Sequence, residues 1–301
     1  MHAKVRAVHK SSIYLPDELK RELGELAART GRSEADLIRH AIERLLAISD
    51  SPAAPAAAPM PVHPRPALIG VGVGPGDPGL VTERARATLG GADRVLVITT
   101  DVRSVGRAEM VVRSVAPTAR VQRVPFAISG DTAARRASLH HVADEALAAL
   151  DADELVAVAV IGDPAQWTIF PDLAARVSAL RPSLHVSAEP GITSYQAAAA
   201  AAGTALGTAG AAMVVLDDAS DLRRHLKSGN DAVVLYKAST DADTLRSAAA
   251  RADRHDAIVA ELSGLPGQRL SALDDAPSGP ISYLAAVVFP ARQPDAAAVT
   301  A

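Results

Sequence analysis

Glycine and proline are concentrated between Gly70 and Gly79, which read Gly-Val-Gly-Val-Gly-Pro-Gly-Asp-Pro-Gly and follow an apolar segment. Because glycine has no Cβ, such a turn lets the backbone approach a bound molecule closely, and turns at strand ends are where open α/β sheets bind ligands. Thr82 stands where its hydroxyl can cap the next helix. The glycine spacing differs from the dinucleotide fingerprint. The stretch indicates a ligand-binding loop, although such turns also occur in purely structural roles.

Other catalytic patterns are missing from the sequence. With no cysteine, disulfides, thiolate zinc sites and cysteine nucleophiles are excluded. No serine–histidine–aspartate spacing, zincin motif or P-loop is present. The pair His140-His141 lies in a helical pattern, and we expect no metal site there. The sequence assigns no catalytic nucleophile or general base.

The composition is typical of a soluble globular protein, with 49% hydrophobic and 22% charged residues. Aromatic residues make up only 3%, which disfavours stacking platforms for single-stranded nucleic acid. A net charge of -3 provides no whole-chain attraction to polyanions. No apolar run approaches the ~20 residues of a membrane helix, and residues 1–6 do not resemble a signal peptide. We expect a cytoplasmic protein without membrane contact.

The elements that must position the glycine turn alternate between strands and helices from residue 67 onward. Apolar strands are predicted at 67–73, 94–98, 155–161 and 184–186, and helices at 132–150 and 170–180. This alternation favours an α/β fold with a largely parallel sheet covered on both faces. A second set of strands is predicted at 213–216, 232–236, 258–260 and 283–289. We expect a lobe at about 67–205 and another at about 206–301, joined near 203–210.

Residues 50–66 are rich in alanine and proline and predict a semi-rigid extended linker. Before the linker, residues 10–15 alternate as a short strand. A helix with apolar residues at Leu19, Leu23 and Leu26 follows, and Ser33 is placed to cap a second helix. About 40 residues with one strand bury too little apolar surface alone, so residues 1–49 are expected to dimerise.

The glycine turn resembles the opening signature of the tetrapyrrole (corrin and porphyrin) methyltransferase family, through residues 72–78 followed by Leu80 and Thr82. Further segments match in order: Gly-Asp-Pro at 162–164, Glu-Pro-Gly-Ile-Thr-Ser at 189–194 and Val-Leu-Tyr-Lys at 234–237. The resemblance spans about residues 67–290. It implies a two-lobed fold with a ligand cleft between the lobes. It also implies S-adenosylmethionine as the methyl donor, bound mainly by backbone.

Carried over by motif, the resemblance implies a set of cofactor-binding residues: Pro75, Gly76, Asp77, Ile161, Gly162, Asp163, Gln166, Thr193, Ser194 and Lys237. Ser263 is a further candidate. Asp163 could instead be a turn residue that bonds its own backbone, and Lys237 could be a solvent-exposed strand end. The sequence departs from the family at Glu261-Leu262-Ser263, where glutamate-arginine-glycine or -alanine is usual, so the last cofactor contact is open.

Within the family, the sequence is most similar to precorrin-2 C-20 methyltransferases of cobalamin biosynthesis. Residues 163–170 follow the aspartate-proline-x-x-aromatic-hydroxyl-x-phenylalanine pattern of these enzymes. Residues 106–109 and 124–126 also resemble their sequences. A tetrapyrrole carries several carboxylates, so cations near the cleft would matter. Several arginines are concentrated in the segment expected near the cleft, although they could instead belong to solvent-exposed helix faces. They are Arg103, Arg107, Arg113, Arg120, Arg123, Arg135 and Arg136.

Residues 1–49 resemble a ribbon-helix-helix module, through the strand-helix-helix order and the run from Tyr14 to Leu19. The resemblance implies that Lys10, Ser12 and Tyr14 face DNA bases from a two-chain ribbon. Backbone amides near Ser33 and Glu34 would hold a phosphate. Residues 1–50 contain nine Lys and Arg and eight Asp and Glu, so they carry almost no net positive charge to attract DNA. DNA binding and dimerisation alone both remain open.

These observations lead to one main hypothesis and two rivals. The main hypothesis is a homodimeric enzyme that methylates a tetrapyrrole, most specifically precorrin-2. One rival is a DNA-binding regulator whose methylase-like domain senses S-adenosylmethionine or a corrinoid. The other rival is methylation of a peptide or an RNA, which would use the same cofactor loops.

Overall fold

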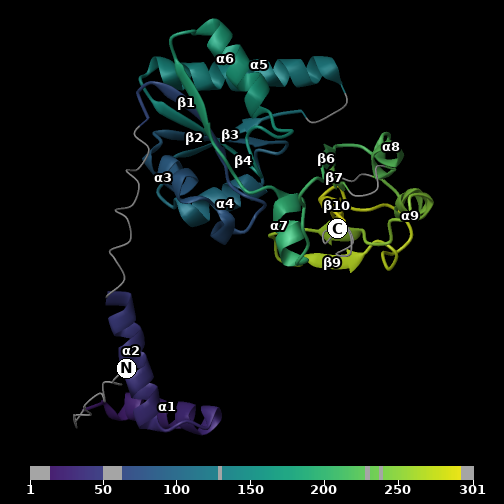
Figure 1. The fold of residues 1–301 in the computed structure, drawn as a ribbon. Coiled ribbons are helices and arrows are strands. Elements are labelled where there is room, and N and C mark those ends of the chain that lie inside the picture. Colours follow the sequence, from purple (N-terminus) through teal and green to yellow (C-terminus); the bar gives the residue numbers. More distant parts are fainter. Residues whose placement is uncertain (1–13, 50–62, 128–130, 228–230, 237–239, 293–301) are drawn as a thin grey trace, which may run out of the picture. The chain divides into compact units, whose positions relative to one another are not determined.

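A computed structural model describes residues 14–49, 63–127, 131–227, 231–236 and 240–292. The chain divides into two compact units, Met1–Pro59 and Met60–Ala301, and each is described by itself (Figure 1). Within the described ranges, no helix combines the length and the apolar character needed to cross a membrane.

The first unit contains helices α1 (Asp17–Thr30) and α2 (Glu34–Ser49). Gly31 ends α1 in the left-handed region, with a φ of 64°, which glycine adopts without steric cost. The predicted cap of α2 is confirmed, because Ser33 Oγ accepts a hydrogen bond of 3.1 Å from the backbone N–H of Asp36. Residues 10–13 of the predicted strand lie outside the described residues, and Tyr14 and Leu15 are in no strand.

The apolar side chains that the structure describes in the first unit do not form a closed core. Among residues 14–42, no side chain that the structure describes is buried. Leu19 and Ile42 are about half exposed, at 50% and 44%. An amphipathic helix pair of this kind gains stability only when its apolar faces are covered.

The second unit begins with a parallel sheet in the order β3-β2-β4-β1-β5. Its strands are β1 (Ala67–Gly72), β2 (Arg94–Thr99), β3 (Val121–Pro125), β4 (Leu155–Val160) and β5 (His185–Glu189). The predicted strands are confirmed within a few residues. Strand β3 was not predicted as a strand, because its sequence Val-Gln-Arg-Val-Pro lacks a continuous apolar run and it lies at the sheet edge.

Helices cover both faces of this sheet, which we call the first lobe. Helices α3 (Glu83–Gly91) and α4 (Arg107–Val115) contribute to one apolar core. Helices α5 (Thr132–Asp151) and α6 (Phe170–Leu180) contribute to the other (Figure 1). The central strands β1 and β4 are buried at every position, which explains why they read as unbroken apolar runs. Thr82 caps α3 as predicted, accepting from the N–H of Ala85 at 3.2 Å.

The second lobe is built on a mixed sheet in the order β6-β7-β10-β8-β9. Its strands are β6 (Met213–Leu216), β7 (Ala232–Tyr236), β8 (Ile258–Glu261), β9 (Arg269–Ala272) and β10 (Ala285–Phe289). Only β6 and β7 pair in parallel; the other neighbours are antiparallel. Helices α8 (Leu222–Leu226) and α9 (Ala242–Arg251) cover one face. Helix α7 (Ser194–Ala201) packs on the other through Tyr195 and Ala198.

Candidate functional site

Three loops meet where β1, β4 and β5 end, and each brings a glycine to the contact. A Cβ built on Gly72 would lie 2.6 Å from the carbonyl oxygen of Gly162 and 2.6 Å from the nitrogen of Gly191. A Cβ on Gly191 would lie 2.1 Å from the same oxygen of Gly162. Real Cβ atoms do not approach backbone so closely, so the backbones touch only because these residues are glycine.

Hydrogen bonds fix these loops to one another. The N–H of Gly162 donates to the carbonyl of Gly74 at 2.8 Å. Asp163 lies in the same loop, where its Oδ1 accepts from the N–H of Ala165 at 2.8 Å and its Oδ2 accepts from the N–H of Gly191 at 3.1 Å. Asp163 therefore both closes its own turn and connects two strand ends.

The turn after β1 forms one of the contacts between the two lobes. Asp77 caps the start of the short 3-10 helix η1 (Pro78–Leu80), because its side chain accepts a hydrogen bond of 2.7 Å from the N–H of Gly79. A Cβ on Gly76 would lie 2.4 Å from Leu265 Cδ2, and a Cβ on Gly264 would lie 2.7 Å from Pro75 Cγ. The turn is thus packed closely against the loop that follows β8.

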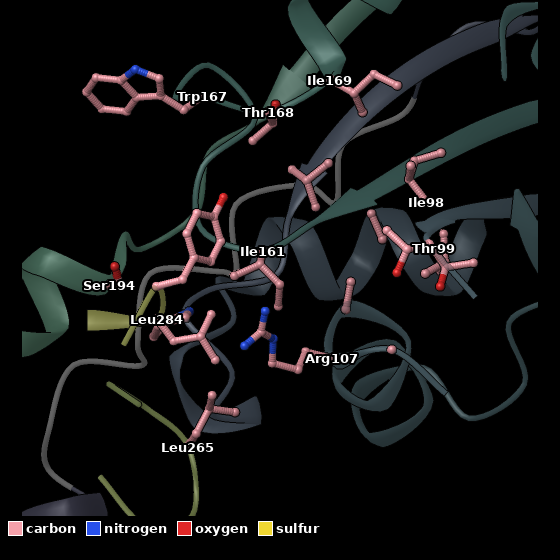
Figure 2. Close-up of a pocket in the computed structure, with 18 of the residues that line it drawn as sticks. Ile98, Thr99, Arg107, Ile161, Trp167, Thr168, Ile169, Ser194, Leu265 and Leu284 are labelled. Carbon is pink, nitrogen blue, oxygen red and sulfur yellow. The ribbon is translucent and has the colours of Figure 1, made fainter. Parts of the chain in front are cut away.

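A cavity of about 450 Å³ opens beside this contact and takes its walls from both lobes (Figure 2). Of the sequence-predicted cofactor residues, Pro75, Ile161 and Ser194 line it, and so does Ser263. The other described ones, which are not among the lining residues, are Gly76, Asp77, Gly162, Asp163, Gln166 and Thr193. Lys237 falls outside the described residues.

Two of the predicted residues that do not line the cavity have structural partners nearby. Gln166 Oε1 accepts from the hydroxyl of Tyr195 at 2.8 Å. Thr193 caps α7 in a reciprocal capping box with Gln196. Both bonds hold the start of α7, and α7 presents Ser194 to the cavity.

Tyr236, at the end of β7, lines the cavity and contacts two other aromatic side chains. The ring centroids of Trp167 and Tyr236 are 5.4 Å apart, and those of Tyr195 and Tyr236 are 6.0 Å apart in an edge-on arrangement. Burial raises the pKa of the Tyr236 phenol, against the lowering effect of its hydrogen bond with Ser194. The phenol therefore stays protonated. In the sequence, Tyr236 was noted only as part of the Val-Leu-Tyr-Lys motif at 234–237. Its position next to the predicted cofactor residue Lys237 was the one sign that it could line the site.

Cavity residues from the loop after β8 and from the stretch before β10 were also missed. Leu265, Tyr283 and Leu284 line the cavity, and Figure 2 shows Leu265 and Leu284 beside the side chain of Arg107. Nothing in their local sequence distinguishes them from ordinary loop residues. Their role depends on how the lobes pack.

The structure separates the arginines that sequence analysis grouped together. Arg107 and Arg135 line the cavity, and Arg107 acts on Tyr236 through its charge. Arg135 also lies over the ring of Phe126 and 3.9 Å from Asp172. Most of the others have carboxylate partners elsewhere: Arg103 with Asp101, Arg113 and Arg123 with Glu109, and Arg120 with Glu154. Arg136 is not among the lining residues.

A buried carboxylate supports the segment that carries Arg107. Glu109 is fully buried in α4, 2.5 Å from Arg123 Nε and 2.7 Å from Arg113 Nη2. The hydrogen bond from Arg123 is the main reason that the pKa of Glu109 lies below its ordinary value. Arg123 also donates to the carbonyl of Val102 at 2.8 Å. Glu109 thereby ties β3 and the loop after β2 to the start of α4.

The groups that line the cavity suit an organic ligand. They are hydroxyls, apolar side chains, aromatic rings and guanidinium groups. In the part of the chain that the structure describes, no three His, Cys, Asp or Glu side chains gather as metal ligands would. The arrangement can hold an organic molecule through apolar contacts and hydrogen bonds, and its guanidinium groups can pair with carboxylates of a ligand.

Comparison with protein families gives two matches. Residues 67–274 match the family model of the tetrapyrrole (corrin/porphyrin) methylases. Residues 12–49 match that of the ribbon-helix-helix proteins of the copG family.

Curated relatives include the cobalamin biosynthesis protein CobIJ of Mycobacterium tuberculosis and of Mycobacterium bovis. Each is 27% identical over 242 residues, which cover 75% of this chain and 46% of the relative. The chain thus spans about half the length of the curated relatives that it matches.

Similar solved structures include the cobalamin biosynthetic enzyme cobalt precorrin-4 methyltransferase CbiF, with a TM-score of 0.56 and 22% identity over 73% of this chain and 93% of that chain. The methyltransferase CobJ gives a TM-score of 0.54 and 21% identity over 76% of this chain and 96% of that one. Uroporphyrin-III-C-methyltransferase of Thermus thermophilus gives 0.51 and 21%, over 74% and 91%. These similarities establish the two-lobed fold.

Proposed function

The chain belongs to the tetrapyrrole (corrin/porphyrin) methylase family, and from this premise we propose that residues 67–301 transfer a methyl group from S-adenosylmethionine to a tetrapyrrole. The observation that carries the proposal is the convergence of the β1, β4 and β5 loops beside a cavity shared by both lobes. Crevices outside the carboxyl ends of parallel strands are where α/β folds bind nucleotide-like ligands.

The cavity residues fit a sulfonium nucleoside. A volume of about 450 Å³ lies within the ~300–1,000 Å³ of small-molecule sites. Pro75 and Ile161 offer apolar surface, and Ser194 offers a hydroxyl. Ser263 also contributes a buried hydroxyl that has no hydrogen-bond partner among the described residues. Such a group favours a ligand that brings its own polar atoms.

The chemistry of the transfer makes few demands on the protein. When bound, S-adenosylmethionine supplies a methyl group that already carries its leaving group. The chain must hold the acceptor in line with that methyl group and exclude water, and orientation of this kind can contribute ~7–11 kcal/mol. The Tyr236, Trp167 and Ile161 side chains provide an apolar wall for the purpose. We assign no residue as a general base.

The acceptor is proposed to be a tetrapyrrole with carboxylate side chains. Arg107 and Arg135 are the cations that line the cavity among the described residues, and guanidinium groups bind carboxylates through paired hydrogen bonds.

Precorrin-2, methylated at C-20, is the specific acceptor that we propose. The segments that resemble precorrin-2 C-20 methyltransferases supply cavity residues, namely Gly106 to Ala108, Phe126 and Trp167 to Ile169. The features that favour this substrate therefore lie where an acceptor would bind.

Calorimetry and turnover test the proposal separately. Wild-type protein should bind S-adenosylmethionine and its demethylated product, and should transfer labelled methyl groups to precorrin-2. Uroporphyrinogen III and cobalt-precorrin-4 serve as matched alternative acceptors. Transfer to one of these alone would correct the substrate. Binding of the cofactor without transfer to any tetrapyrrole would favour a sensor, and absence of cofactor binding would overturn the whole proposal.

For residues 1–49 we propose dimerisation and contact with DNA. The ribbon-helix-helix match covers residues 12–49, and the exposed apolar positions Leu19 and Ile42 need a partner surface. Tyr14, at 97% exposure, is available to a DNA groove; the other proposed base contacts, Lys10 and Ser12, lie outside the described residues. Selection from a random DNA library by the full chain, followed by Tyr14→Ala, tests this role.

A further inference from the structure

Ser263 carries a buried hydroxyl whose hydrogen-bonding capacity is unused. The residue is 3% exposed, and Ser263 Oγ has no hydrogen-bond partner within the part of the chain that the structure describes. Buried hydroxyls are almost always paired, because an unpaired one has given up water without compensation. The hydroxyl therefore costs stability in the ligand-free protein.

The backbone around Ser263 is held in a defined turn at the cavity wall. Leu262 has a φ of 54°, which is uncommon for a residue with a branched side chain, and Gly264 has a φ of 71°. The N–H of Leu265 donates to the carbonyl of Leu262 at 2.9 Å, and the N–H of Gly264 donates to Gln268 Oε1 at 2.8 Å. These bonds fix the loop that places Ser263 at the cavity.

The same turn lies against the loop proposed to hold the cofactor. The close approach of Gly264 to Pro75, and of Leu265 to Gly76, joins the two loops. Ser263 and Pro75 both line the cavity. Ser263 is uncharged, and a neutral hydroxyl suits the ribose hydroxyls and ring nitrogens of a nucleoside better than the carboxylates of the acceptor, for which the arginines are available.

We propose that the Ser263 hydroxyl binds the cofactor directly, by forming a hydrogen bond with the nucleoside part of S-adenosylmethionine. This inference rests on the proposed function of the cavity. It assigns to this chain a side-chain contact at the position where its sequence departs from the family pattern. The unpaired hydroxyl is then a preorganised partner, and ligand binding removes its cost.

The proposal predicts opposite effects of Ser263→Ala on stability and on binding. In the full-length protein without ligand, Ser263→Ala should raise the melting temperature by about 2–4 °C, because the unpaired group is removed. In calorimetry with S-adenosylhomocysteine, the same variant should show a Kd about tenfold higher, because the ligand loses its partner. Replacing a serine with a purely structural role would not both raise the melting temperature and weaken the binding of S-adenosylhomocysteine.

Ser271→Ala is the matched control, because Ser271 lies in β9 of the same lobe and is not among the cavity residues. Its melting temperature and Kd should stay near those of wild type. Equal S-adenosylhomocysteine affinity in wild type and Ser263→Ala would overturn this proposal alone, as would a lower melting temperature in the variant. Failure of wild type to bind the nucleoside would instead overturn the proposed function, and this inference with it. A raised KM for the tetrapyrrole with unchanged nucleoside affinity would reassign Ser263 to the acceptor and contradict the proposal.

Discussion

The carboxylate of Asp163 accepts a hydrogen bond of 3.1 Å from the backbone N–H of Gly191, and this bond ties the loop after β4 to the loop after β5. Its other oxygen accepts from the N–H of Ala165 at 2.8 Å. Asp163 is not among the residues that line the cavity. We therefore infer that it positions the loops, and its variants can separate this role from direct contact with a ligand.

Asp163→Asn should lower both stability and cofactor affinity. An amide has only one oxygen, so its NH₂ group would face one of the two backbone N–H donors. The free energy of unfolding should fall by about 1–2 kcal/mol, and the binding free energy of S-adenosylmethionine should weaken by a similar amount. Urea denaturation and calorimetry measure the two. Asp144→Asn, on the exposed side of α5, is the control. Wild-type stability combined with abolished binding would show that Asp163 contacts the ligand directly.

Gly191→Ala should damage the site severely. The new Cβ would lie 2.1 Å from the carbonyl oxygen of Gly162 and 2.8 Å from Gly72 Cα, so the loops must separate. We expect a loss of about 3 kcal/mol of stability and no measurable cofactor binding. Gly90→Ala is the control, because nothing lies within 4 Å of its Cβ and it lies in α3. That variant should gain about 0.5–1 kcal/mol. Normal binding by Gly191→Ala would refute the loop geometry.

Glu109 should make stability depend on pH in the acid range. Its folded pKa lies below the ordinary value of 4.5, so its stabilising effect is present above about pH 4.5 and is lost as pH falls through the lower, folded pKa. At pH 7, Glu109→Gln should cost about 2–3 kcal/mol, because Arg123 and Arg113 lose their charged partner.

Chemical denaturation of wild type and Glu109→Gln between pH 3 and pH 8 checks this dependence. The difference between the proteins should be constant near neutrality and should shrink below about pH 4.5. A difference that grows on acidification would contradict the assigned direction of the pKa shift.

Arg107→Ala should weaken acceptor binding specifically. If Arg107 binds an acceptor carboxylate, the KM for precorrin-2 should rise about tenfold, and the Kd for S-adenosylmethionine should change less than twofold. Arg103→Ala serves as the control, since Arg103 is paired with Asp101 and its side chain is 90% exposed. The reverse pattern, with cofactor affinity lost and KM unchanged, would show that Arg107 instead binds the carboxylate of the cofactor.

Leu19→Lys should disrupt self-association of the full chain. Leu19 is half exposed on α1, and no described side chain in residues 14–42 is buried. A lysine there would place a charge in the proposed dimer interface, and we expect the dimer Kd to rise at least about tenfold. Sedimentation velocity measures the change, with Glu22→Lys on the same helix as control. A wild-type monomer would refute dimerisation through this unit.

Much of the fold could be predicted because its signals are local. Strands β1 and β4 are buried on both faces, which produces unbroken apolar runs, and Thr82 and Ser33 cap helices through bonds to their near neighbours. Strands β3 and β9 were missed because edge strands with polar residues lack that signature. The antiparallel pairing of the second sheet was likewise not evident, because pairing direction depends on neighbours distant in sequence.

The site was predicted in part for the same reason. The absence of a Cβ follows from the residue type, so the glycine loops could be recognised in the sequence and predicted to form a ligand site. The selection of Arg107 and Arg135 from among the arginines required the structure, since an arginine faces a cavity or a carboxylate according to long-range packing.

The sequence by itself determined the glycine loops, the order of strands and helices, and the family to which they belong, because these depend on local backbone preferences and on spacing along the chain. Tertiary structure alone decided that Gly72, Gly162 and Gly191 touch, that α7 packs on the second sheet, and that Ser263 is buried without a partner among the described residues. Those relationships arise when segments distant from one another in the sequence exclude water together, and no local pattern encodes which side chains will then face one another.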